Sequence, residues 1–382
     1  ILRADLNVPV LNGVISEQSR IEAVRPTIKK LIKNKNKIFI LSHFGRPQGI
    51  RDKKFSLKFI CSALQKVLQI NKIYFLENLE HKDIKTTIEK MNPGEVCLFE
   101  NIRFYSEEEN NDINFAKMLS KNFDVYINDA FSASHRKHSS IVNIPKMLTS
   151  YAGTSLIKEI ENINFFIKNP KKPNLAIIGG SKISTKISLL NQLVEICDTI
   201  FIGGAMANTF LKAKRIDIGK SLYENDFIKK AHSIINKARE IDCKIILPID
   251  VVCADNLNKK SSIRLCDVRD VLHNQMILDI GEKTVKKISK HIFKSNMILW
   301  NGPLGAFEYK PFEKSSIQIA NIIKEHTNTN KIQSIAGGGD TLSLIKKAKA
   351  RNGFTYISNA GGAFLEWLEG KESPGIIALK EN

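Results

Sequence analysis

Short apolar runs recur along the chain, and each one ends in polar or glycine-rich residues and precedes a segment with helical spacing. Examples are the runs at 38–41, 96–99, 175–178 and 297–300. Strands that alternate with helices in this way are the signature of βαβ units and of parallel sheets. The pattern predicts an α/β protein built of doubly wound, Rossmann-like parallel sheets.

The residues that follow these runs differ between the two halves of the chain. In the first half they are charged or hydrogen-bonding, as in "SHFGRP" (42–47) and "HRKHSS" (135–140). In the second half they are glycines, as in "IIGGSK" (177–182) and "AGGGDT" (336–341). Ligands of such sheets bind at the carboxyl ends of the strands. Arginine forks suit carboxylate and phosphate groups, whereas glycine turns let backbone N–H groups approach the phosphates of a nucleotide.

A chain of 382 residues predicts two domains. Between the two kinds of strand end, apolar residues recur at helical spacing over 150–173 until "NPKKP" ends the helix. We expect a first domain at 1–150, an interdomain hinge helix at 151–168, a second domain at 169–360, and a C-terminal segment at 361–382 that returns toward the first domain, with the ligand cleft between the domains.

The composition is that of a globular protein, with 43% hydrophobic and 25% charged residues, and without an apolar run that could span a membrane. The six cysteines have no zinc-like or disulfide-framework spacing, which favours a reducing cytoplasm. The chain opens at Ile1 inside a strand-like run, so we expect residues to precede it.

The formal net charge of +19 has two interpretations. One is a polyanionic partner, either nucleic acid or small phosphorylated ligands. The other is a lysine-rich composition whose charges are solvated surface, because runs such as "LIKNKNK" (31–37) contain no interleaved aromatic residues.

Each candidate in the first half also has an ordinary structural explanation. His43 and Arg46 stand in a turn closed by glycine and proline, and Arg20 and Arg103 could form surface ion pairs. Asp5 and Asn7 could cap a turn. A metal pair at "HRKH" is disfavoured because no acidic residue lies beside it.

In the second half, the three glycines at 337–339 precede Asp340 and a helix-like run, which is typical of a phosphate-binding turn. Lys182 and Lys186 are four residues apart, which predicts that both lie on one face of the helix that follows. Snorkelling lysines and, for Glu308, an ordinary helix N-terminal charge are the alternatives. Neither a Walker A sequence nor a G-x-G-x-x-G in the first βα turn is present.

Taken together and in order, these segments resemble the phosphoglycerate kinase family over nearly the whole chain. The segments that carry the resemblance are "RADLNVP", "SHFGRP", "ENIRF", "HRKHSS", "GGSKISTK", "NGPLGAFE", "AGGGDT" and "GGAFLEWLEGK". The resemblance implies a glycolytic kinase that transfers a phosphoryl group reversibly between 1,3-bisphosphoglycerate and ADP, by direct in-line transfer when the domains close. It also implies Mg²⁺ with ATP or ADP, small-molecule partners, no membrane, little prospect of nucleic acid, and a monomer.

In that family the first domain holds 3-phosphoglycerate. The resemblance implies that Asp5 and Asn7 contact the glycerate and that Arg20 contacts its reacting carboxylate end. The basic patch for the 3-phosphate then comprises His43, Arg46, Arg103 and Arg136, and the substrate-binding set includes Leu6, Phe44 and Gly45.

The second domain of the family holds the nucleotide. The resemblance implies that Lys186 contacts the nucleotide phosphates, that Lys182 contacts the transferring phosphoryl group, and that Glu308 binds the ribose. The residues near the nucleotide would include Ala205, Leu222 and Asn301, and those at the β- and γ-phosphates and the metal would be Gly338, Gly339, Asp340 and Thr341, with Asp340 as the metal ligand.

Two departures from the family pattern stand out. Asn359 and Ala360 replace a more usual Thr and Gly, and Ala205 replaces a glycine. A left-handed φ at Ala360 would be costly. The alternatives to the enzyme are a basic nucleic-acid-binding or scaffold protein that keeps the fold without turnover, and an unrelated two-domain kinase.

Overall fold

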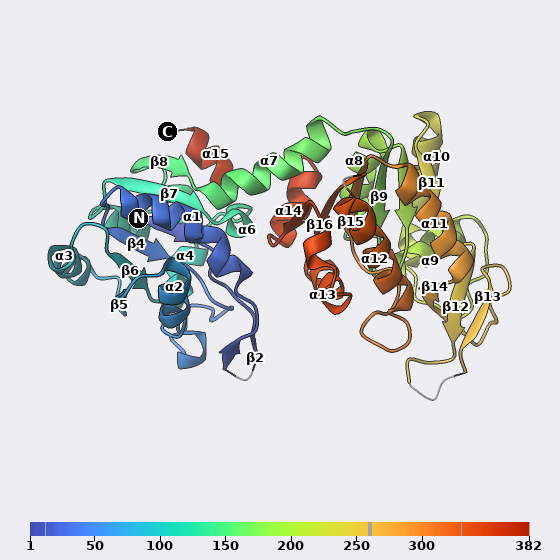
Figure 1. The fold of residues 1–382 in the computed structure, drawn as a ribbon, viewed down its shortest axis with the longest axis horizontal. Helices are drawn as coiled ribbons and strands as arrows, with labels where there is room; N and C mark the ends of the chain where they lie inside the picture. Colours follow the sequence, from blue (N-terminus) through green and yellow to red (C-terminus); the bar gives the residue numbers. More distant parts are fainter. Residues whose placement is uncertain (12, 259–261, 330, 382) are drawn as a thin grey trace. The chain divides into compact units, whose positions relative to one another are not determined.

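The computed structural model describes residues 1–11, 13–258, 262–329 and 331–381. The chain forms two compact units (Figure 1). Unit 1 comprises Ile1–Glu161 and Lys371–Asn382, and unit 2 comprises Asn162–Gly370. The hinge role that the sequence assigns to 151–168 stays a prediction, and each unit is described by itself.

Unit 1 contains a six-stranded sheet in the order β5-β6-β4-β1-β7-β8, and every pair in it is parallel. Its strands are β1 (Leu2–Ala4), β4 (Ile38–Leu41), β5 (Tyr74–Leu76), β6 (Val96–Phe99), β7 (Val125–Asp129) and β8 (Thr149–Ala152). The strand order reverses where β1 meets β7, so the carboxyl ends of these two strands flank the topological switch point.

Alternate residues of the unit 1 strands enter different cores. In β4, Ile38 and Ile40 belong to one apolar cluster, whereas Phe39 and Leu41 belong to another. Helices α1 and α2 pack on the first face, and α3 and α5 on the second. The period of two therefore produces the doubly covered parallel sheet that the sequence predicts. The helices of unit 1 are α1 (Ser19–Lys33), α2 (Ile60–Leu68), α3 (His81–Lys90), α4 (Ser106–Glu109), α5 (Ile113–Ser120), α6 (Phe131–Ser134) and α15 (Pro374–Lys380), with the short hairpin strands β2 (Val10–Leu11) and β3 (Val14–Ile15).

Unit 2 contains a second all-parallel sheet, in the order β11-β10-β9-β15-β16-β17. Its strands are β9 (Asn174–Ile178), β10 (Thr199–Ile202), β11 (Lys244–Ile246), β15 (Met297–Asn301), β16 (Gln333–Gly337) and β17 (Tyr356–Ser358). This is the 3-2-1-4-5-6 order of Rossmann folds, with its switch point between β9 and β15. The doubly wound prediction is confirmed in both units.

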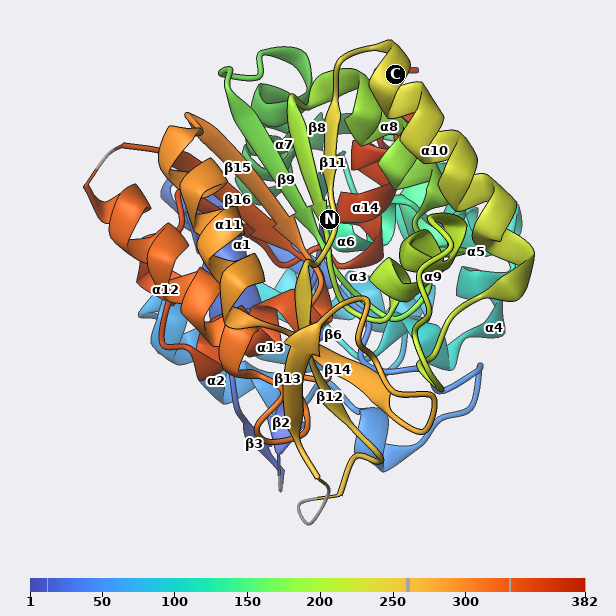
Figure 2. The same ribbon diagram turned by 90° about the vertical axis from the view of Figure 1, so that its right-hand side faces the viewer.

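An antiparallel sheet and further α-helices make up the rest of the described part of unit 2 (Figure 2). The sheet has the order β13-β12-β14 and comprises β12 (Asp250–Ala254), β13 (Arg264–Asp267) and β14 (Met276–Ile280). The helices are α8 (Ile187–Ile196), α9 (Met206–Ala213), α10 (Ile228–Glu240), α11 (Glu282–Lys294), α12 (Lys314–Asn328), α13 (Gly339–Lys347) and α14 (Gly362–Leu368).

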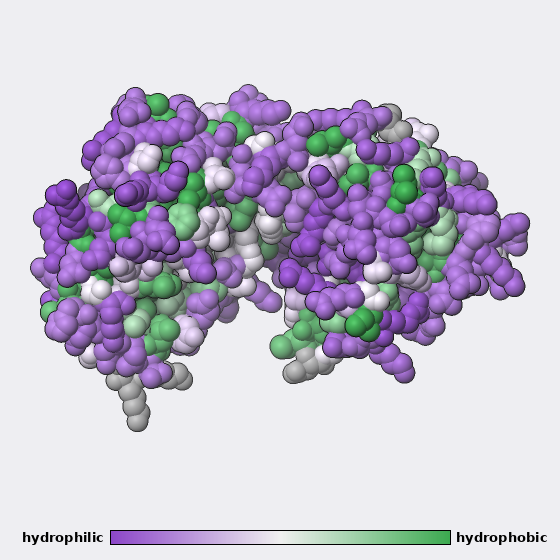
Figure 3. Space-filling view, turned by 180° about the vertical axis from the view of Figure 1, so that it is seen from behind, coloured by the Kyte–Doolittle hydropathy of each residue, from purple (hydrophilic) through white to green (hydrophobic). Residues whose placement is uncertain are grey.

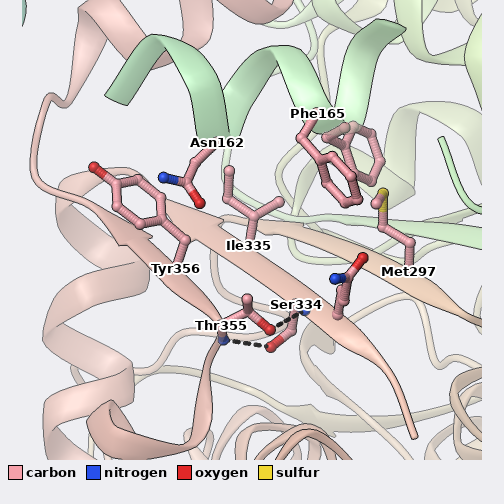
Figure 4. A pocket seen from close by; sticks show the side chains of 9 residues that line it. Asn162, Phe165, Met297, Ser334, Ile335, Thr355 and Tyr356 are labelled. Atoms are coloured by element: carbon pink, nitrogen blue, oxygen red, sulfur yellow. Dashed lines mark hydrogen bonds between the residues drawn. The ribbon is translucent and has the colours of Figure 1, made fainter. Parts of the chain in front are cut away.

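Helix α7 (Thr154–Lys168) crosses the boundary and is hydrogen-bonded within each unit, in unit 2 through Trp367 Nε1, which donates to Asn164 Oδ1 at 3.0 Å. In unit 1, the N–H of Thr154 donates to Thr27 Oγ1 at 2.9 Å and that of Leu156 to Asp129 Oδ1 at 3.0 Å. In unit 2, Phe165 and Asn162 line a cavity of about 200 Å³ against the starts of β15, β16 and β17 (Figure 4). The helix is thus a covalent link that each unit anchors separately.

The surface of the part of the protein seen in Figure 3 is predominantly hydrophilic. Among the described residues, we find no helix with the length and apolarity needed to cross a membrane.

Candidate active site

Asp5 organises the carboxyl end of β1 in unit 1. Its Oδ2 accepts hydrogen bonds from Arg20 Nη1 at 2.6 Å and from the hydroxyl of Ser132, and its Oδ1 accepts the N–H of Asn7 at 3.1 Å. Asp5 therefore closes a turn, as its ordinary explanation held, and also fixes a guanidinium at the first turn of α1. A guanidinium carries five N–H donors, of which this bond to Asp5 uses one.

The turn after β4 is fixed by two asparagines. Asn7 Oδ1 accepts the N–H of Gly45 at 3.0 Å, and Asn101 donates to the carbonyls of Phe44 and Phe55 at 2.7 and 3.0 Å. Gly45 has a φ of +62°, and a Cβ there would lie 2.5 Å from the ring of Phe55. Only glycine therefore permits this turn, and the turn brings the N–H of Gly45 to Asn7 Oδ1.

Two buried side chains, Arg3 of β1 and His43 just after β4, lie next to each other at this edge of the sheet. Arg3 is 0% exposed, and its Nη2 lies 3.2 Å from Nδ1 of the buried His43. A guanidinium can only donate, so Nδ1 accepts and the ring proton resides on Nε2. Burial, and then the charges of Arg3, Arg103 and Arg20, hold the pKa of His43 well below its usual range. His43 is thus a neutral hydrogen-bond donor.

The predicted basic patch combines one buried arginine with two accessible ones. Arg103 is 3% exposed, its Nη1 donates to the carbonyl of Gly45 at 2.8 Å, and its Nε lies 3.3 Å from Glu109. Burial lowers its pKa to about 10, which leaves it charged at neutral pH. Arg46 is exposed and Arg136 half-buried, and neither guanidinium has a hydrogen-bond or ion-pair partner within the described part of the chain. Arg136 is close enough to Arg103 to lower its pKa.

Glu108 is linked to the buried Arg3 through Ser140. It is fully buried and accepts the N–H and hydroxyl of Ser140 at 2.8 and 2.6 Å, while Ser140 Oγ also accepts from Arg3 Nε at 3.0 Å. Burial raises the pKa of the Glu108 carboxyl and lowers that of the nearby His138 to about 3. Unit 1 therefore presents a positively charged hydrogen-bonding surface that suits a small anion with a carboxylate and a phosphate.

In unit 2, Lys186 lies at the switch point. Its Nζ donates to the carbonyl of Gly179 at 2.7 Å and to Asn301 Oδ1 at 2.6 Å, which joins the ends of β9 and β15. Burial lowers the pKa of this ammonium to about 8, and the nearby charge of Asp340 opposes that shift. An anion bound here would restore the full charge of the lysine.

The prediction that Lys182 and Lys186 share a helix face is wrong. Helix α8 begins at Ile187, and Lys186 is its N-cap residue. The preceding residues form turns, in which Ser184 donates from both its N–H and its hydroxyl to Glu224. This competing side-chain bond keeps the backbone out of the helix. Lys182 is exposed, whereas Lys186 turns back onto the strand ends.

The glycine turn after β16 has a fitted geometry. Gly338 has a φ of +99°, and a Cβ there would lie 2.6 Å from Asn301 Nδ2. Asn301 donates to the carbonyl of Gly337 at 2.6 Å, and the N–H of Gly302 donates to Thr341 Oγ1 at 2.7 Å. Gly339 and Asp340 are exposed in the first turn of α13, whose free N–H groups favour an anion.

A pocket of about 290 Å³ lies beside this turn. The predicted residues that line it are Ala205, Leu222, Glu308 and Asp340. Its apolar wall includes Met276 and Leu278 of β14, which is enough to cover a flat ring system. Glu308 lies in a turn before α12, which begins at Lys314, so its explanation as a helix N-terminal charge is wrong.

Comparison with known proteins matches residues 1–371 to the family model described as phosphoglycerate kinase. The chain belongs to the phosphoglycerate kinase family. It is therefore an enzyme, a phosphotransferase of glycolysis. It is 42% identical over 381 residues to the phosphoglycerate kinase of Chelativorans sp. (strain BNC1), covering 100% of this chain and 96% of that protein. The match to the Mesorhizobium japonicum protein of the same name is 44% over 380 residues, covering 100% and 95%.

Solved structures of phosphoglycerate kinases agree with the fold. The Coxiella burnetii structure has a TM-score of 0.89 at 38% identity, covering 100% of this chain and 95% of that one. The Pyrococcus horikoshii structure has a TM-score of 0.80 at 29% identity, covering 99% and 95%.

Phosphoglycerate kinases use ATP or ADP, generally with Mg²⁺, and the residues here fit that ion. Asp340 is exposed, lines the pocket of about 290 Å³ and has no hydrogen-bond or ion-pair partner in the described chain. No cluster of three or more His, Cys, Asp or Glu side chains that could hold a metal occurs among the described residues. Mg²⁺ commonly binds through one or two carboxylates together with substrate phosphates and waters, so a single aspartate is sufficient.

The sequence predictions missed several members of both sites. They include Arg3, Asn101, Glu108, Ser132 and Ser140 in unit 1 and Asp279 in unit 2. Arg3 and Asn101 stand in the segments "RADLNVP" and "ENIRF", so a charged residue inside the first strand and an amide just after β6 were available signals. Asp279 had none, because it is the fold that places its buried carboxyl in the pocket wall, where burial raises its pKa to about 7.

Proposed function

We propose that unit 1 binds 3-phosphoglycerate or 1,3-bisphosphoglycerate and that unit 2 binds ADP or ATP, so that a phosphoryl group passes directly between the two ligands. The observation that carries this assignment is the contrast at the two switch points. Unit 1 has buried and exposed arginines at the ends of its strands, and unit 2 has glycine turns beside an apolar pocket.

In unit 1, Arg20 receives the reacting carboxylate end, because Asp5 holds its guanidinium at 2.6 Å. We assign Asp5 and Asn7 to the hydroxyl and other polar atoms of the glycerate. The 3-phosphate is bound by His43 through Nε2 and by Arg46, Arg103 and Arg136, and Leu6, Phe44 and Gly45 shape the walls. Arginine suits this site because its fork binds carboxylate and phosphate with two hydrogen bonds.

In unit 2, the β- and γ-phosphates lie against the backbone of Gly338, Gly339 and Thr341, and Lys186 neutralises them. Glu308 and Leu222 both line the pocket, and we assign Glu308 to the ribose and Leu222 to the base. Asp340 would hold Mg²⁺, which supplies additional charge neutralisation to the phosphates when bound. The exposed Lys182 is free to reach the transferring group.

The reaction needs no general base, because its nucleophile in either direction is already an anion. Catalysis therefore depends on positioning and on charge stabilisation by Arg20, Lys182, Lys186 and helix N-termini. In the ligand-free protein His43 is held neutral, whereas Arg103 retains its charge at neutral pH because its pKa is lowered only to about 10.

In-line transfer requires reacting atoms roughly 3–3.5 Å apart and the exclusion of water. We propose that the ligands reach this distance when the two units close, with 151–168 as the hinge. Small-angle scattering should then give a smaller radius of gyration with both ligands than with either one. An active sample whose radius is the same in all states would contradict closure.

The activity is tested by a coupled assay with 3-phosphoglycerate, MgATP and the full-length chain. We expect turnover that is saturable in both substrates. Absence of turnover together with binding of nucleic acid that weakens steeply with salt would favour the non-enzymatic alternative.

We also propose that the enzyme is a cytoplasmic monomer. Each unit supplies all the residues assigned to its own ligand, and all six cysteines are free thiols, which suits a reducing compartment. Light scattering of the purified protein tests the oligomeric state.

A further inference from the structure

A second large cavity of unit 2 is separate from the nucleotide pocket. It has a volume of about 390 Å³ and lies along β11, the edge strand of the parallel sheet. Apolar side chains line its inner part, among them Leu211, Ile216, Ile246 and Val268. It shares Pro248 with the nucleotide pocket. Its size is within the range of small-molecule sites.

Cations surround this cavity. Lys214, Lys244, Arg269 and Lys287 line it, and Asp267 is the one carboxylate among its described lining residues. None of the four cationic side chains has a hydrogen-bond or ion-pair partner among the residues that the structure describes. They come from four separate places in the chain: the end of α9, the start of β11, the loop after β13, and the middle of α11.

This lack of counter-ions is not general in unit 2. Lys237 pairs with Glu195 at 2.6 Å, Lys172 with Asp198 at 3.0 Å, and Lys212 with Asp217 at 3.5 Å. Lysines in this lysine-rich chain thus form ion pairs where a carboxylate is near. Asp267 is the one carboxylate among the described residues that line the cavity. Its Oδ1 accepts the backbone N–H of Arg269 and no side-chain cation of the cavity.

The cations repel one another in the folded protein. The pKa of Lys214 is lowered by burial and then by Arg239 and Lys287. The pKa of His291 is lowered by burial and then by Lys244, Lys287 and Lys294. Lys287 acts on both groups, so the repulsion extends along the cavity. A bound anion would relieve this repulsion.

We propose that this cavity is a second ligand site, which binds a small phosphorylated molecule with an apolar or aromatic moiety. Its phosphate is held by Lys214, Lys244 and Lys287, and the apolar moiety packs against Ile216 and Val268. Lysine serves as a point-charge binder of phosphate. A helix C-terminus explains the presence of Lys214 at the end of α9, but not the convergence of the other three cations on the same cavity.

The experiment uses 1-naphthyl phosphate as the probe and inorganic phosphate as its apolar-free counterpart, on the full chain with saturating ADP. Isoleucine methyl groups labelled with ¹³C report the location. We expect the probe to shift the methyl signals of Ile216 and Ile246 and to leave those of Ile277 and Ile280, which line the nucleotide pocket, in their ADP-bound positions.

The double variant Lys214→Gln/Lys287→Gln should weaken probe binding by about tenfold, the loss expected for two charged contacts. The control Lys229→Gln/Lys230→Gln removes the same charge from exposed positions of α10 outside the cavity and should bind within about twofold of the parent. Phosphoryl transfer without the probe should be unchanged in both, and neither should unfold at a lower temperature than the parent, because removal of Lys214 and Lys287 relieves repulsion.

Three results would overturn the proposal. The first is equal affinity of the parent and both double variants. The second is a probe that shifts Ile277 and Ile280 alone. The third is inorganic phosphate that binds as tightly as 1-naphthyl phosphate, which would remove the apolar half of the proposed ligand.

Discussion

The two candidate ligand sites lie at equivalent places in two doubly wound sheets, yet they are built from different materials. In unit 1, side chains provide the contacts, and Arg3, Arg103, Asn101 and Glu108 are buried and hydrogen-bonded to one another or to the backbone. In unit 2, the backbone provides them, through glycine turns in which a Cβ at Gly179, Gly302 or Gly338 would lie within 2.6 Å of another atom.

The two kinds of site should therefore respond differently to substitution. A site of guanidinium groups loses function when a charge is removed, because arginine keeps its proton even where burial lowers its pKa to about 10. A site of glycine turns loses function when an atom is added. Lys186 combines a charged side chain with a backbone turn, because its ammonium donates to the carbonyl of Gly179 and to Asn301 Oδ1. Burial lowers the pKa of this ammonium to about 8.

The largest effect is expected for Arg20→Ala in unit 1. Removal of a guanidinium that contacts the reacting group should lower kcat by roughly 10³–10⁵-fold, as for other arginines that stabilise phosphoryl transfer. The measurement is steady-state turnover in the coupled assay.

Arg25→Ala is the matched control, because Arg25 is an exposed arginine on the same helix. It should retain parental kcat. If Arg20→Ala has the stability and the turnover of the parent, Arg20 has no role in the chemistry.

Asp340→Asn tests the metal in unit 2. The substitution keeps the shape and removes the charge, so the Mg²⁺ concentration needed for half-maximal activity should rise by at least roughly tenfold, while the KM for 3-phosphoglycerate changes little. Asp226→Asn, an exposed site outside the nucleotide pocket, is the control. The same Mg²⁺ dependence in Asp340→Asn and the parent would make Asp340 a helix N-terminal charge only.

The fold was predictable because it depends on patterns that the chain repeats. Apolar runs with polar or glycine ends specify buried parallel strands, and Ile38 to Leu41 show how consecutive residues supply two cores. The similar segments "AIIGG" (176–180) and "IFIGG" (200–204) contain the ends of the neighbouring parallel strands β9 and β10. The antiparallel sheet β13-β12-β14 was not predicted, because its three strands follow one another without a helix between them and so depart from the βαβ pattern.

The site was predictable at strand ends and not beyond them. Gly45 and Gly338 are required by positive φ and by close neighbours, and sequence position alone located both. Lys186 was placed on the wrong element, because spacing does not reveal that Ser184 bonds to Glu224, forty residues away. Glu108 and Asp279 were missed, because a buried carboxyl looks like a solvated one in the sequence.

Adding a methyl group should separate two adjacent glycines of unit 2. Gly338→Ala combines a φ of +99° with a contact of 2.6 Å to Asn301 Nδ2, and Asn301 in turn holds Lys186. It should lower the free energy of unfolding by about 1–3 kcal/mol and weaken ADP binding. For Gly339→Ala, a Cβ meets nothing within 4 Å. Its stability, measured by urea unfolding, should stay at or above that of the parent, and equal losses in both variants would contradict the geometry.

Lys186 should take up a proton when nucleotide binds. Its lowered pKa of about 8 means that part of the population is neutral at pH 8.5, and the phosphates raise the pKa and restore the charge. Calorimetric titration with ADP in buffers of different ionisation enthalpy should show partial proton uptake at pH 8.5 and little at pH 6.5. Uptake that persists in Lys186→Met would assign the titration to another group.

The smallest effect is expected at Ala360, where the chain departs from its family. Ala360 is buried, its N–H donates to Ser358 Oγ at 3.2 Å, and it is not among the non-glycine residues with positive φ in the described chain. The left-handed position belongs to the next residue, Gly361, with a φ of +57°. The methyl group of Ala360 is therefore unstrained, and Ala360→Gly should lower the free energy of unfolding by about 0.4–1 kcal/mol, because glycine loses more backbone freedom on folding.

Gly361→Ala, whose Cβ would meet nothing within 4 Å, should cost about 1–2 kcal/mol through its φ alone. Neither substitution touches a charged group of the site, so the KM for ATP should change less than in Gly338→Ala. If Ala360→Gly were more stable than the parent, the backbone at Ala360 would be strained. The replacement of the family's glycine by alanine would then destabilise the protein, contrary to the φ observed at this position.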